Sequence, residues 1–394
     1  MHTHIPAAYA DLAASMAADD VAIRTALAAD GITFAPWPDL RGSARAAGTA
    51  AARAHPMQGV LKYHGLADWD YRTAYLPSIS LCNDAGSTLT LVEFDPSLAE
   101  DSATIGGALA SGRERERVVQ SLDAVRALSG ATVRARVVSQ NTVRGGGGAG
   151  KGLGTSASAS AALALAATAA LYGEPTAGNL RLVTALARLL AGSGCRAASG
   201  GCSLWLSYPG VAHEESFAVR LDDAGQLDNV RLLTIPLDSR IGLKTEQAHV
   251  DAPESSLFAG WMRSRRDEIL TCIAAARAGD WRTIGQWAEL DSMRLHGITM
   301  SGSMEHKLIG WEPENITIFR RCDELRQRGA PVYCSTDTGP TAVLITHRDH
   351  EAAAASAFAD FPLIAGRIGG PAQLVDVRDA VRELGAASAQ FIHR

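Results

Sequence analysis

Three features of the sequence predict an α+β fold. Alternating apolar and polar residues, many of them β-branched, are typical of strands in 58-QGVLKYH, 87-STLTLVEF and 131-ATVRARVVSQ. A glycine-rich loop and a long helix of small residues follow the last of these strands. Longer helical periodicities and two short apolar strands then occupy the C-terminal part of the chain. Helices and strands are therefore mixed along the chain, as in an α+β protein.

The elements suggest an appendage followed by two domains. Residues 1–52 form an Ala-rich N-terminal appendage whose weak helical periodicity is broken at 36-PWPDLRG. We expect one domain over 53–220, which contains the glycine loop, and a second over 221–394. The remaining predicted elements are helices near 179–191, 254–278, 281–296 and 313–328, a turn of small residues at 192–201 ahead of an aromatic strand, and strands at 332-VYCS and 341-TAVLITH.

The composition favours an ordered cytoplasmic protein. Hydrophobic residues make up 47% and charged residues 20% of the 394 residues, which argues against a disordered chain. The formal net charge is −5 and no Lys or Arg run stands out, so we expect no nucleic-acid partner. The longest apolar stretch, 157–171, is shorter than the about 20 residues of a bilayer span, so it predicts a buried helix and no membrane partner.

The N-terminus and the cysteines support the same conclusion. The N-terminus lacks the basic start and continuous apolar run of a secretory signal, and its acidic residues argue against a transit peptide. The six cysteines are scattered without a CxxC pair, which predicts reduced thiols and neither a zinc site nor a disulfide framework.

The glycine loop 145-GGGGAGKGLGTS precedes a helix that ends at Gly173. Backbone N–H groups of such a loop, next to a helix N-terminus, suit a phosphate group. The P-loop signature nearly occurs here, but Gly152 stands where Ser or Thr would hold magnesium. Taken alone, the loop fits either a phosphate site or a glycine loop that merely caps a core helix.

The segment 152-GLGTSASASAA resembles the GLxSSA phosphate loop of the GHMP kinase superfamily. The resemblance implies that ATP and Mg²⁺ bind here, with Ser156 or Ser158 available to the metal ion. The residues implied to line the ATP triphosphate are Gly152, Leu153, Gly154, Thr155 and Ser156.

Three further segments, 62-KYHG, 192-GSGCR and 336-TDTGP, resemble patterns of the diphosphomevalonate decarboxylase family within that superfamily. The segments 244-KTEQAH and 368-IGGPA resemble its phosphomevalonate decarboxylase branch more closely. This resemblance implies the GHMP kinase fold, with a ribosomal-protein-S5-like N-terminal half and a ferredoxin-like C-terminal half around a central cleft. It also implies ATP-dependent decarboxylation of (R)-5-phosphomevalonate to isopentenyl phosphate, in an alternative mevalonate pathway, and a homodimer.

The same resemblance assigns the catalytic residues. Asp337 would be the general base that takes the proton of the 3-hydroxyl group as this oxygen attacks the γ-phosphorus. Thr336 and Thr338 would orient it. Arg196 would hold the substrate carboxylate through its planar guanidinium, and Lys62 would lie near Asp337. A lysine inside the apolar segment 59-GVLKY needs a buried partner.

The resemblance also implies substrate contacts for Tyr63 and Ser193, while Lys244, Thr245 and Gln247 are either phosphate contacts or loop residues. The diphosphate enzymes carry a second lysine where this chain has Leu66, and an arginine near the position of His249. Loss of cations favours a substrate with one phosphate fewer, because an unpaired phosphate would carry a desolvation penalty.

Three other functions remain open at this point. The chain could decarboxylate diphosphomevalonate, or it could be a GHMP small-molecule kinase that phosphorylates and stops. It could also be an ATP-independent bisphosphate decarboxylase or a ligand-binding relic. Release of CO₂ in step with ADP distinguishes a decarboxylase from a kinase. Binding of ATP distinguishes both from an ATP-independent decarboxylase or a ligand-binding relic.

Overall fold

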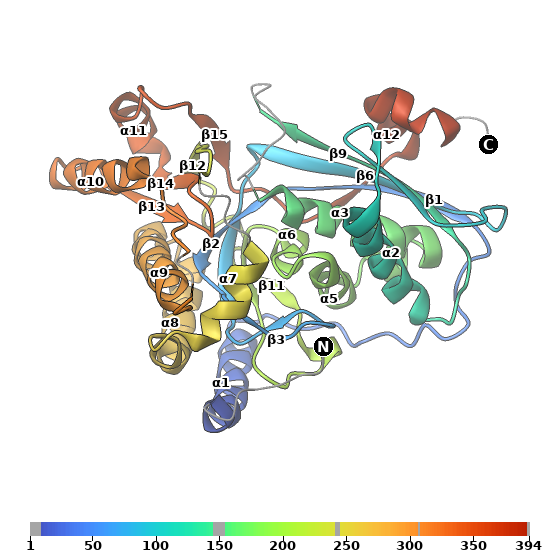
Figure 1. Cartoon of the computed structure of the whole chain (residues 1–394), viewed down its shortest axis with the longest axis horizontal. Helices are drawn as coiled ribbons and strands as arrows, with labels where there is room; N and C mark the ends of the chain where they lie inside the picture. Colours follow the sequence, from blue (N-terminus) through green and yellow to red (C-terminus); the bar gives the residue numbers. More distant parts are fainter. Residues whose placement is uncertain (1–8, 145–153, 241–244, 306–307, 392–394) are drawn as a thin grey trace.

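The computed structural model describes residues 9–144, 154–240, 245–305 and 308–391. Helices and strands are mixed along the chain, which confirms the predicted α+β class (Figure 1). Three sheets and a small hairpin carry the strands. The hairpin consists of β3 (Leu66–Asp68) and β4 (Thr73–Ala74).

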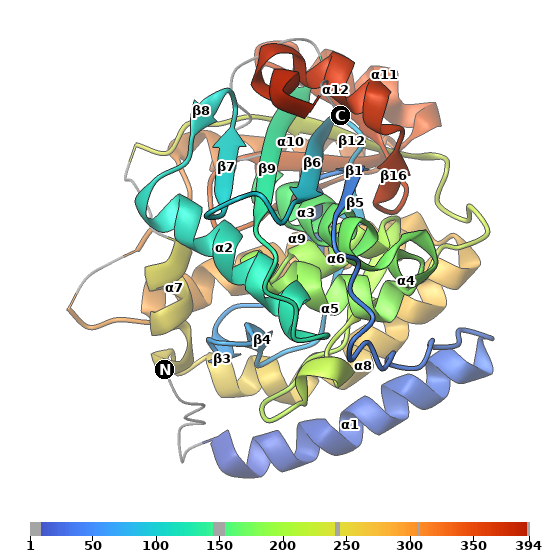
Figure 2. The same cartoon turned by 90° about the vertical axis from the view of Figure 1, so that its right-hand side faces the viewer.

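The largest sheet has six strands and is covered by helices on both faces. Helix α12 (Val377–Leu384) lies on one face, and α3 (Thr155–Tyr172) with α2 (Gly112–Ala127) lies on the other (Figures 1 and 2). Alternate residues of strand β6 (Gly86–Phe94) point to the two faces of the sheet: Leu91 packs with α12, and Val92 packs with α2 and α3. The strand order is β16 (Gln373–Val375), β1 (Gly48–Ala54), β6 (Gly86–Phe94), β9 (Ala135–Val143), β7 (Ser102–Ile105) and β8 (Ala108–Leu109).

Two four-stranded sheets meet around helix α9 (Trp281–Ser301), which packs against strand β2 of one sheet and strand β13 of the other. This packing brings together the residues that follow these two strands, Lys62 and Asp337. The first sheet has the order β11 (Ala218–Arg220), β10 (Cys202–Trp205), β5 (Ser78–Cys82) and β2 (Met57–Leu61). The second has the order β13 (Val332–Thr336), β14 (Ala342–His347), β12 (Val230–Ile235) and β15 (Ile364–Arg367).

The remaining helices surround these sheets. The helix α1 packs along α8 through residues that include Ile23 and Ile273, so much of the predicted appendage rests on the body of the protein (Figure 2). These helices are α1 (Ala10–Ala29), α4 (Glu174–Ala177), α5 (Leu180–Leu190), α6 (Gly194–Ser199), α7 (Thr245–Asp251), α8 (Phe258–Ala278), α10 (Pro313–Gln327) and α11 (Glu351–Ala357).

Helix α3 is long and apolar enough to cross a membrane, but 83% of it is buried inside this fold. It is therefore the core helix that the run of small residues predicted. The turn predicted at 192–201 is wrong in part, because helix α6 occupies most of this segment. The pairing of β16 with β1 adds a C-terminal strand to the N-terminal sheet, and the domain boundaries at 52/53 and 220/221 stay predictions.

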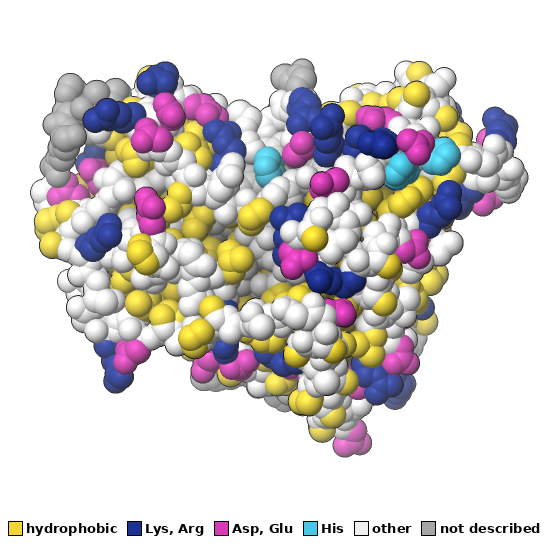
Figure 3. All heavy atoms as spheres, turned by 180° about the vertical axis from the view of Figure 1, so that it is seen from behind, with side chains coloured by type: hydrophobic (Ala, Val, Ile, Leu, Met, Phe, Trp, Pro, Cys, Tyr) yellow, Lys and Arg dark blue, Asp and Glu magenta, His cyan; other side chains and the backbone are white. Residues whose placement is uncertain are grey.

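Charges of both signs are interspersed on the surface. Figure 3 shows the side of the molecule opposite to that in Figure 1, where Lys and Arg side chains stand among Asp and Glu side chains. Positive charge on this face is therefore locally balanced by negative charge.

Candidate active site

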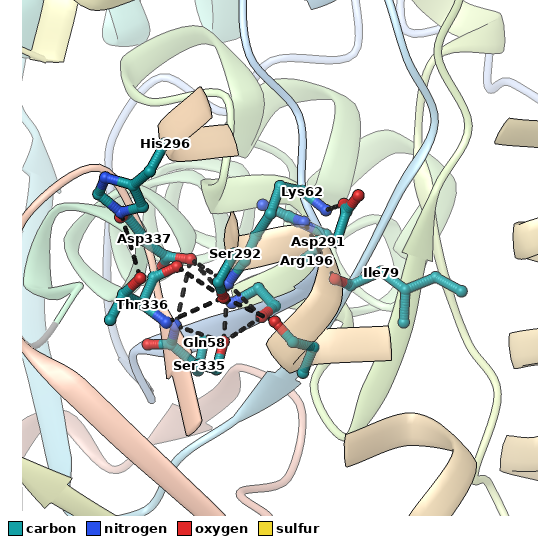
Figure 4. A network of polar contacts seen from close by, with 12 residues as sticks. Gln58, Lys62, Ile79, Arg196, Asp291, Ser292, His296, Ser335, Thr336 and Asp337 are labelled. Carbon is teal, nitrogen blue, oxygen red and sulfur yellow. Dashed lines mark hydrogen bonds and ion pairs between the residues drawn. The ribbon is translucent and has the colours of Figure 1, made fainter. Parts of the chain in front are cut away.

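A partly buried ion pair joins Lys62 and Asp337, which lie 275 residues apart in the sequence. The Lys62 ammonium group donates to Asp337 Oδ1 at 3.0 Å, to Gly59 O at 2.6 Å and to Ser335 Oγ at 2.7 Å (Figure 4). A lysine ammonium group has three N–H donors, so these contacts use all of them. The predicted proximity of Lys62 and Asp337 is therefore seen in the structure.

The two partners differ in exposure. The Lys62 side chain is 2% exposed, whereas the Asp337 side chain is 37% exposed and borders the cavity. Burial lowers the pKa of Lys62 below its ordinary value, because a dry environment penalises the charged form, and the Asp337 carboxylate opposes this shift. Asp337 is thus the member of the pair that is accessible to a ligand.

Asp337 is oriented by groups from strand β2. Its Oδ1 also accepts hydrogen bonds from Gln58 Nε2 at 3.2 Å and from the Gly59 backbone N–H at 3.3 Å. A Cβ atom at position 59 would lie 2.8 Å from Lys62 Cδ and 2.9 Å from Asp337 Oδ1, so only glycine fits there without displacing the pair. Within the described part of the chain, these three hydrogen bonds all reach Oδ1 and none reaches Oδ2.

A second layer of polar residues on α8 and α9 supports the pair. Asp291 accepts from the Lys62 backbone N–H at 2.6 Å, from Trp261 Nε1 at 2.7 Å and from Arg265 Nη2 at 3.1 Å. His296 Nε2 lies 2.8 Å from the Asp337 backbone oxygen. Sequence reasoning missed Asp291, Arg265 and His296, since nothing in their local pattern separates them from ordinary helix residues.

Arg196 lies on α6 with a side chain that is nearly unpartnered. It is 2% exposed, and its one hydrogen bond among the described residues runs from Nη1 to Ile79 O at the long distance of 3.5 Å. Its Nε is buried without a partner, and its guanidinium carbon lies 5.3 Å from the centre of the Tyr63 ring. A buried guanidinium with spare donors fits an anionic ligand, and a carboxylate matches its planar geometry.

One cavity of about 350 Å³ collects these side chains. A hollow of about 1040 Å³ between β1, β16 and α12 is larger, but it contains none of the predicted site residues. The smaller cavity is therefore the candidate active site. The predicted residues that line it are Lys62, Tyr63, Gly154, Thr155, Ser156, Ser193, Arg196, Thr245 and Asp337.

Three of the predicted site residues, Gly152, Leu153 and Lys244, lie outside the described residues. Gln247 is not brought to the cavity: its Nε2 donates to Asp251 Oδ1 at 2.9 Å on an exposed part of α7. Thr338 lines the cavity, as its predicted orienting role requires. Thr336 instead turns to Trp311, whose Nε1 donates to Thr336 Oγ1 at 3.0 Å.

The start of helix α3 fits a phosphate group. Gly154 adopts φ +71°, which favours glycine, and a Cβ atom there would lie 2.9 Å from Met57 O. Thr155 and Ser156 follow in the first turn, where backbone N–H groups lack intrahelical acceptors. The Ser156 side chain is exposed at the cavity, whereas the buried Ser158 hydroxyl is engaged with Thr88 Oγ1 at 2.6 Å. Of the two serines, Ser156 is the one that remains available to a metal ion.

The class of protein follows from comparisons with known proteins. The profile of the diphosphomevalonate decarboxylase-like N-terminal domain matches residues 54–218. A phosphomevalonate decarboxylase of Haloferax volcanii is 33% identical, over 84% of this chain and 99% of its own. A mevalonate 3,5-bisphosphate decarboxylase of Thermoplasma volcanium is 28% identical, over 75% of this chain and 76% of its own.

Solved structures agree with this class. Mevalonate diphosphate decarboxylase of Enterococcus faecalis, in a study of ATP binding mediated by mevalonate diphosphate, is 27% identical with a TM-score of 0.73, over 84% of this chain and 99% of its own. A complex described as MDDEF with MVAPP, AMPPCP and magnesium gives the same values of identity, TM-score and coverage.

These structures confirm the predicted GHMP kinase fold. The chain belongs to the diphosphomevalonate decarboxylase family.

Proposed function

We propose that this chain catalyses the ATP-dependent decarboxylation of (R)-5-phosphomevalonate to isopentenyl phosphate, with release of ADP, phosphate and CO₂, in an alternative mevalonate pathway. One observation carries the proposal: the Lys62–Asp337 pair and the spare donors of Arg196 border a single cavity that reaches the start of α3. Such a cavity can hold an acid, a hydroxyl group and a nucleotide phosphate together.

Each side chain has a separate task. Asp337 accepts the proton of the 3-hydroxyl group, and Lys62 holds this carboxylate in place. Arg196 grips the C1 carboxylate through two parallel N–H donors until it leaves as CO₂. ATP, bound with Mg²⁺ at Gly154, Thr155 and Ser156, supplies the phosphoryl group that makes the 3-oxygen a good leaving group.

The choice of a monophosphate rests on the charges of the cavity. Among the described residues that line it, Lys62 and Arg196 are the two Lys or Arg side chains, and both already have tasks. Leu66, at the position of the family's second lysine, is 6% exposed in strand β3. The other described side chains that line the cavity and can donate to the substrate phosphate, such as Tyr63, Ser193 and Thr245, are neutral, which suits one phosphate better than two.

The experiment measures CO₂ and ADP in parallel, with 5-phosphomevalonate and with diphosphomevalonate as substrates. We expect equimolar CO₂ and ADP and a higher kcat/KM for the monophosphate. ADP without CO₂ would identify a kinase, and CO₂ without ATP would identify an ATP-independent decarboxylase. A higher kcat/KM for the diphosphate would overturn the substrate assignment alone. Calorimetric titration of ATP, with and without Mg²⁺, tests the nucleotide site independently of turnover.

The proposal also covers the cellular location and the oligomeric state of the protein. We infer a cytoplasmic enzyme that acts on a small molecule without nucleic-acid or membrane partners and that forms a homodimer. We also infer that residues 53–220 and 221–394 act as the two halves of the catalytic body, with 1–52 as an addition to it. Light scattering at micromolar concentration tests the dimer.

A further inference from the structure

His249 on helix α7 occupies a defined place at the cavity wall. Its ring stacks on that of Tyr63, with the centroids 5.3 Å apart and an interplanar angle of 14°. Its centroid is 4.8 Å from that of His64. Both histidines and Tyr63 line the cavity. These aromatic contacts hold the plane of the His249 ring.

The hydrogen bonds decide which nitrogen of His249 carries the proton. The Gly65 backbone N–H donates to His249 Nδ1 at 3.0 Å. A backbone amide cannot accept a hydrogen bond through its N–H group, so Nδ1 must be the bare acceptor. In a neutral imidazole the proton then sits on Nε2. No hydrogen bond between described residues uses this Nε2–H donor.

The surroundings keep His249 neutral. Burial and the nearby Arg72 guanidinium lower the pKa of His249 to about 4, against the opposing effect of Glu246. The other groups that face the ring, Tyr63 and His64, carry no charge near neutral pH. His249 therefore offers one N–H donor and no positive charge.

Arg72 is held in place by an unusual backbone. It has φ +51° and is the one non-glycine residue with positive φ in the part of the chain that the structure describes. The preceding turn is secured because the Asp68 carboxylate accepts from the Tyr71 N–H at 2.8 Å and Arg188 Nε donates to Tyr71 O at 2.8 Å. Strained backbone of this kind persists only where the surroundings enforce it, and it often serves a site. Here it keeps a cation near His249.

We propose that His249 determines the specificity for the substrate phosphate, because its neutral Nε2–H donates to one phosphate without providing the positive charge that a second phosphate needs. This inference rests on the proposed function. It deepens that function by assigning the choice between mono- and diphosphate to a side chain whose tautomer the fold imposes.

Three variants test the assignment: His249→Phe, which removes the donor, His249→Gln, which retains an N–H group, and His249→Arg, which adds a charge. His350→Arg, outside the cavity, is the matched control. For His249→Phe we expect a KM for 5-phosphomevalonate that is raised about 10-fold or more, with little change in kcat, since a hydrogen bond to a charged group is lost. His249→Gln should restore most of this loss.

For His249→Arg we expect the ratio of kcat/KM for the monophosphate to that for the diphosphate to fall about 10-fold or more. An unchanged ratio in folded His249→Arg, or an unchanged KM in folded His249→Phe, would overturn the inference. Circular dichroism and thermal melts check that each variant folds.

A measurement without turnover separates this inference from the proposed function. Isothermal titration with inorganic phosphate and with pyrophosphate compares the wild type, His249→Arg and His350→Arg. We expect pyrophosphate binding to strengthen about 10-fold or more in His249→Arg alone. If the wild type releases no CO₂ and this gain is still seen, the proposed function fails while His249 keeps its role at the anion site. Equal pyrophosphate binding in all three proteins would refute that role.

Discussion

Replacement of Asp337 by asparagine tests the centre of the site. The substitution keeps the shape of the side chain and its acceptor oxygen, but it removes the negative charge and the ability to take a proton. We expect turnover to fall at least about 100-fold, the usual effect of losing a general base. The bonds from Gln58 and Gly59 can persist, so the loss should appear in kcat more than in the folded structure.

The cost in stability follows from the contacts of Lys62. The ammonium group keeps Gly59 O and Ser335 Oγ as acceptors, and its third bond changes from an ion pair to a hydrogen bond from a charged donor to a neutral amide oxygen. The hydrogen bond itself can remain, so only the charge–charge attraction is lost, and for a solvent-accessible pair this should lower the free energy of unfolding by up to about 1 kcal/mol. Because Asp337 is 37% exposed, solvent screening keeps the effect at this small size.

The assay follows CO₂ and ADP release together, with urea unfolding of the same samples. Asp360→Asn is the control, since Asp360 pairs with Arg321 at the surface and lies away from the cavity. We expect the control to keep its turnover. Near-normal CO₂ release by folded Asp337→Asn would refute the assignment of the general base. A collapse of the fold in this variant alone would instead show that the energetic reasoning about Lys62 is wrong.

Two further perturbations follow from the same geometry. Gly59→Ala should lower turnover about 10-fold or more, because the added Cβ lies within 3 Å of Lys62 Cδ and Asp337 Oδ1. Gly260→Ala is the control, because a Cβ at this position on α8 lies in open space. It should leave turnover unchanged and raise the free energy of unfolding in urea by up to about 1 kcal/mol. Equal turnover of the two variants would contradict the close packing at Gly59. Burial lowers the pKa of Lys62 in the folded protein below its ordinary value of 10.5. Between these two pKa values the unfolded chain therefore binds more protons at this site than the folded protein does. As the pH rises toward 10.5, the free energy of unfolding of the wild type should increase relative to that of Lys62→Met. A stability difference between these two proteins that does not change between pH 8 and pH 10.5, measured by urea unfolding, would show that the pKa of Lys62 is not lowered.

Local patterns were enough to predict most of the elements that carry the site. The alternation in 87-STLTLVEF predicted strand β6, and the small residues after the glycine loop predicted helix α3, because each signal lies within one stretch of chain. Helix α6 was predicted as a turn, since six residues with two alanines and a glycine give too short a pattern. Its packing against α3 and α5 stabilises it instead.

Some of the candidate site residues could likewise be found from the sequence, and others could not. Lys62, Arg196 and Asp337 were found through resemblance to a family, and the structure brings them to one cavity while their catalytic roles stay predictions. Asp291 and His296 escaped notice because a polar residue on a helix signals nothing until its neighbours are known. Gln247 looked like a phosphate contact, yet the turn of α7 directs it to Asp251.

By itself the sequence determined the α+β class, the order of the main strands and helices, and the residue types needed to bind phosphate, hydroxyl and carboxylate groups. Only the tertiary structure decided that Lys62 is buried against a more exposed Asp337, that Arg196 keeps spare donors, and that the proton of His249 sits on Nε2. The physical reason is that pKa, tautomer and hydrogen-bond satisfaction depend on groups that fold together from distant positions. A local pattern contains no information about those neighbours.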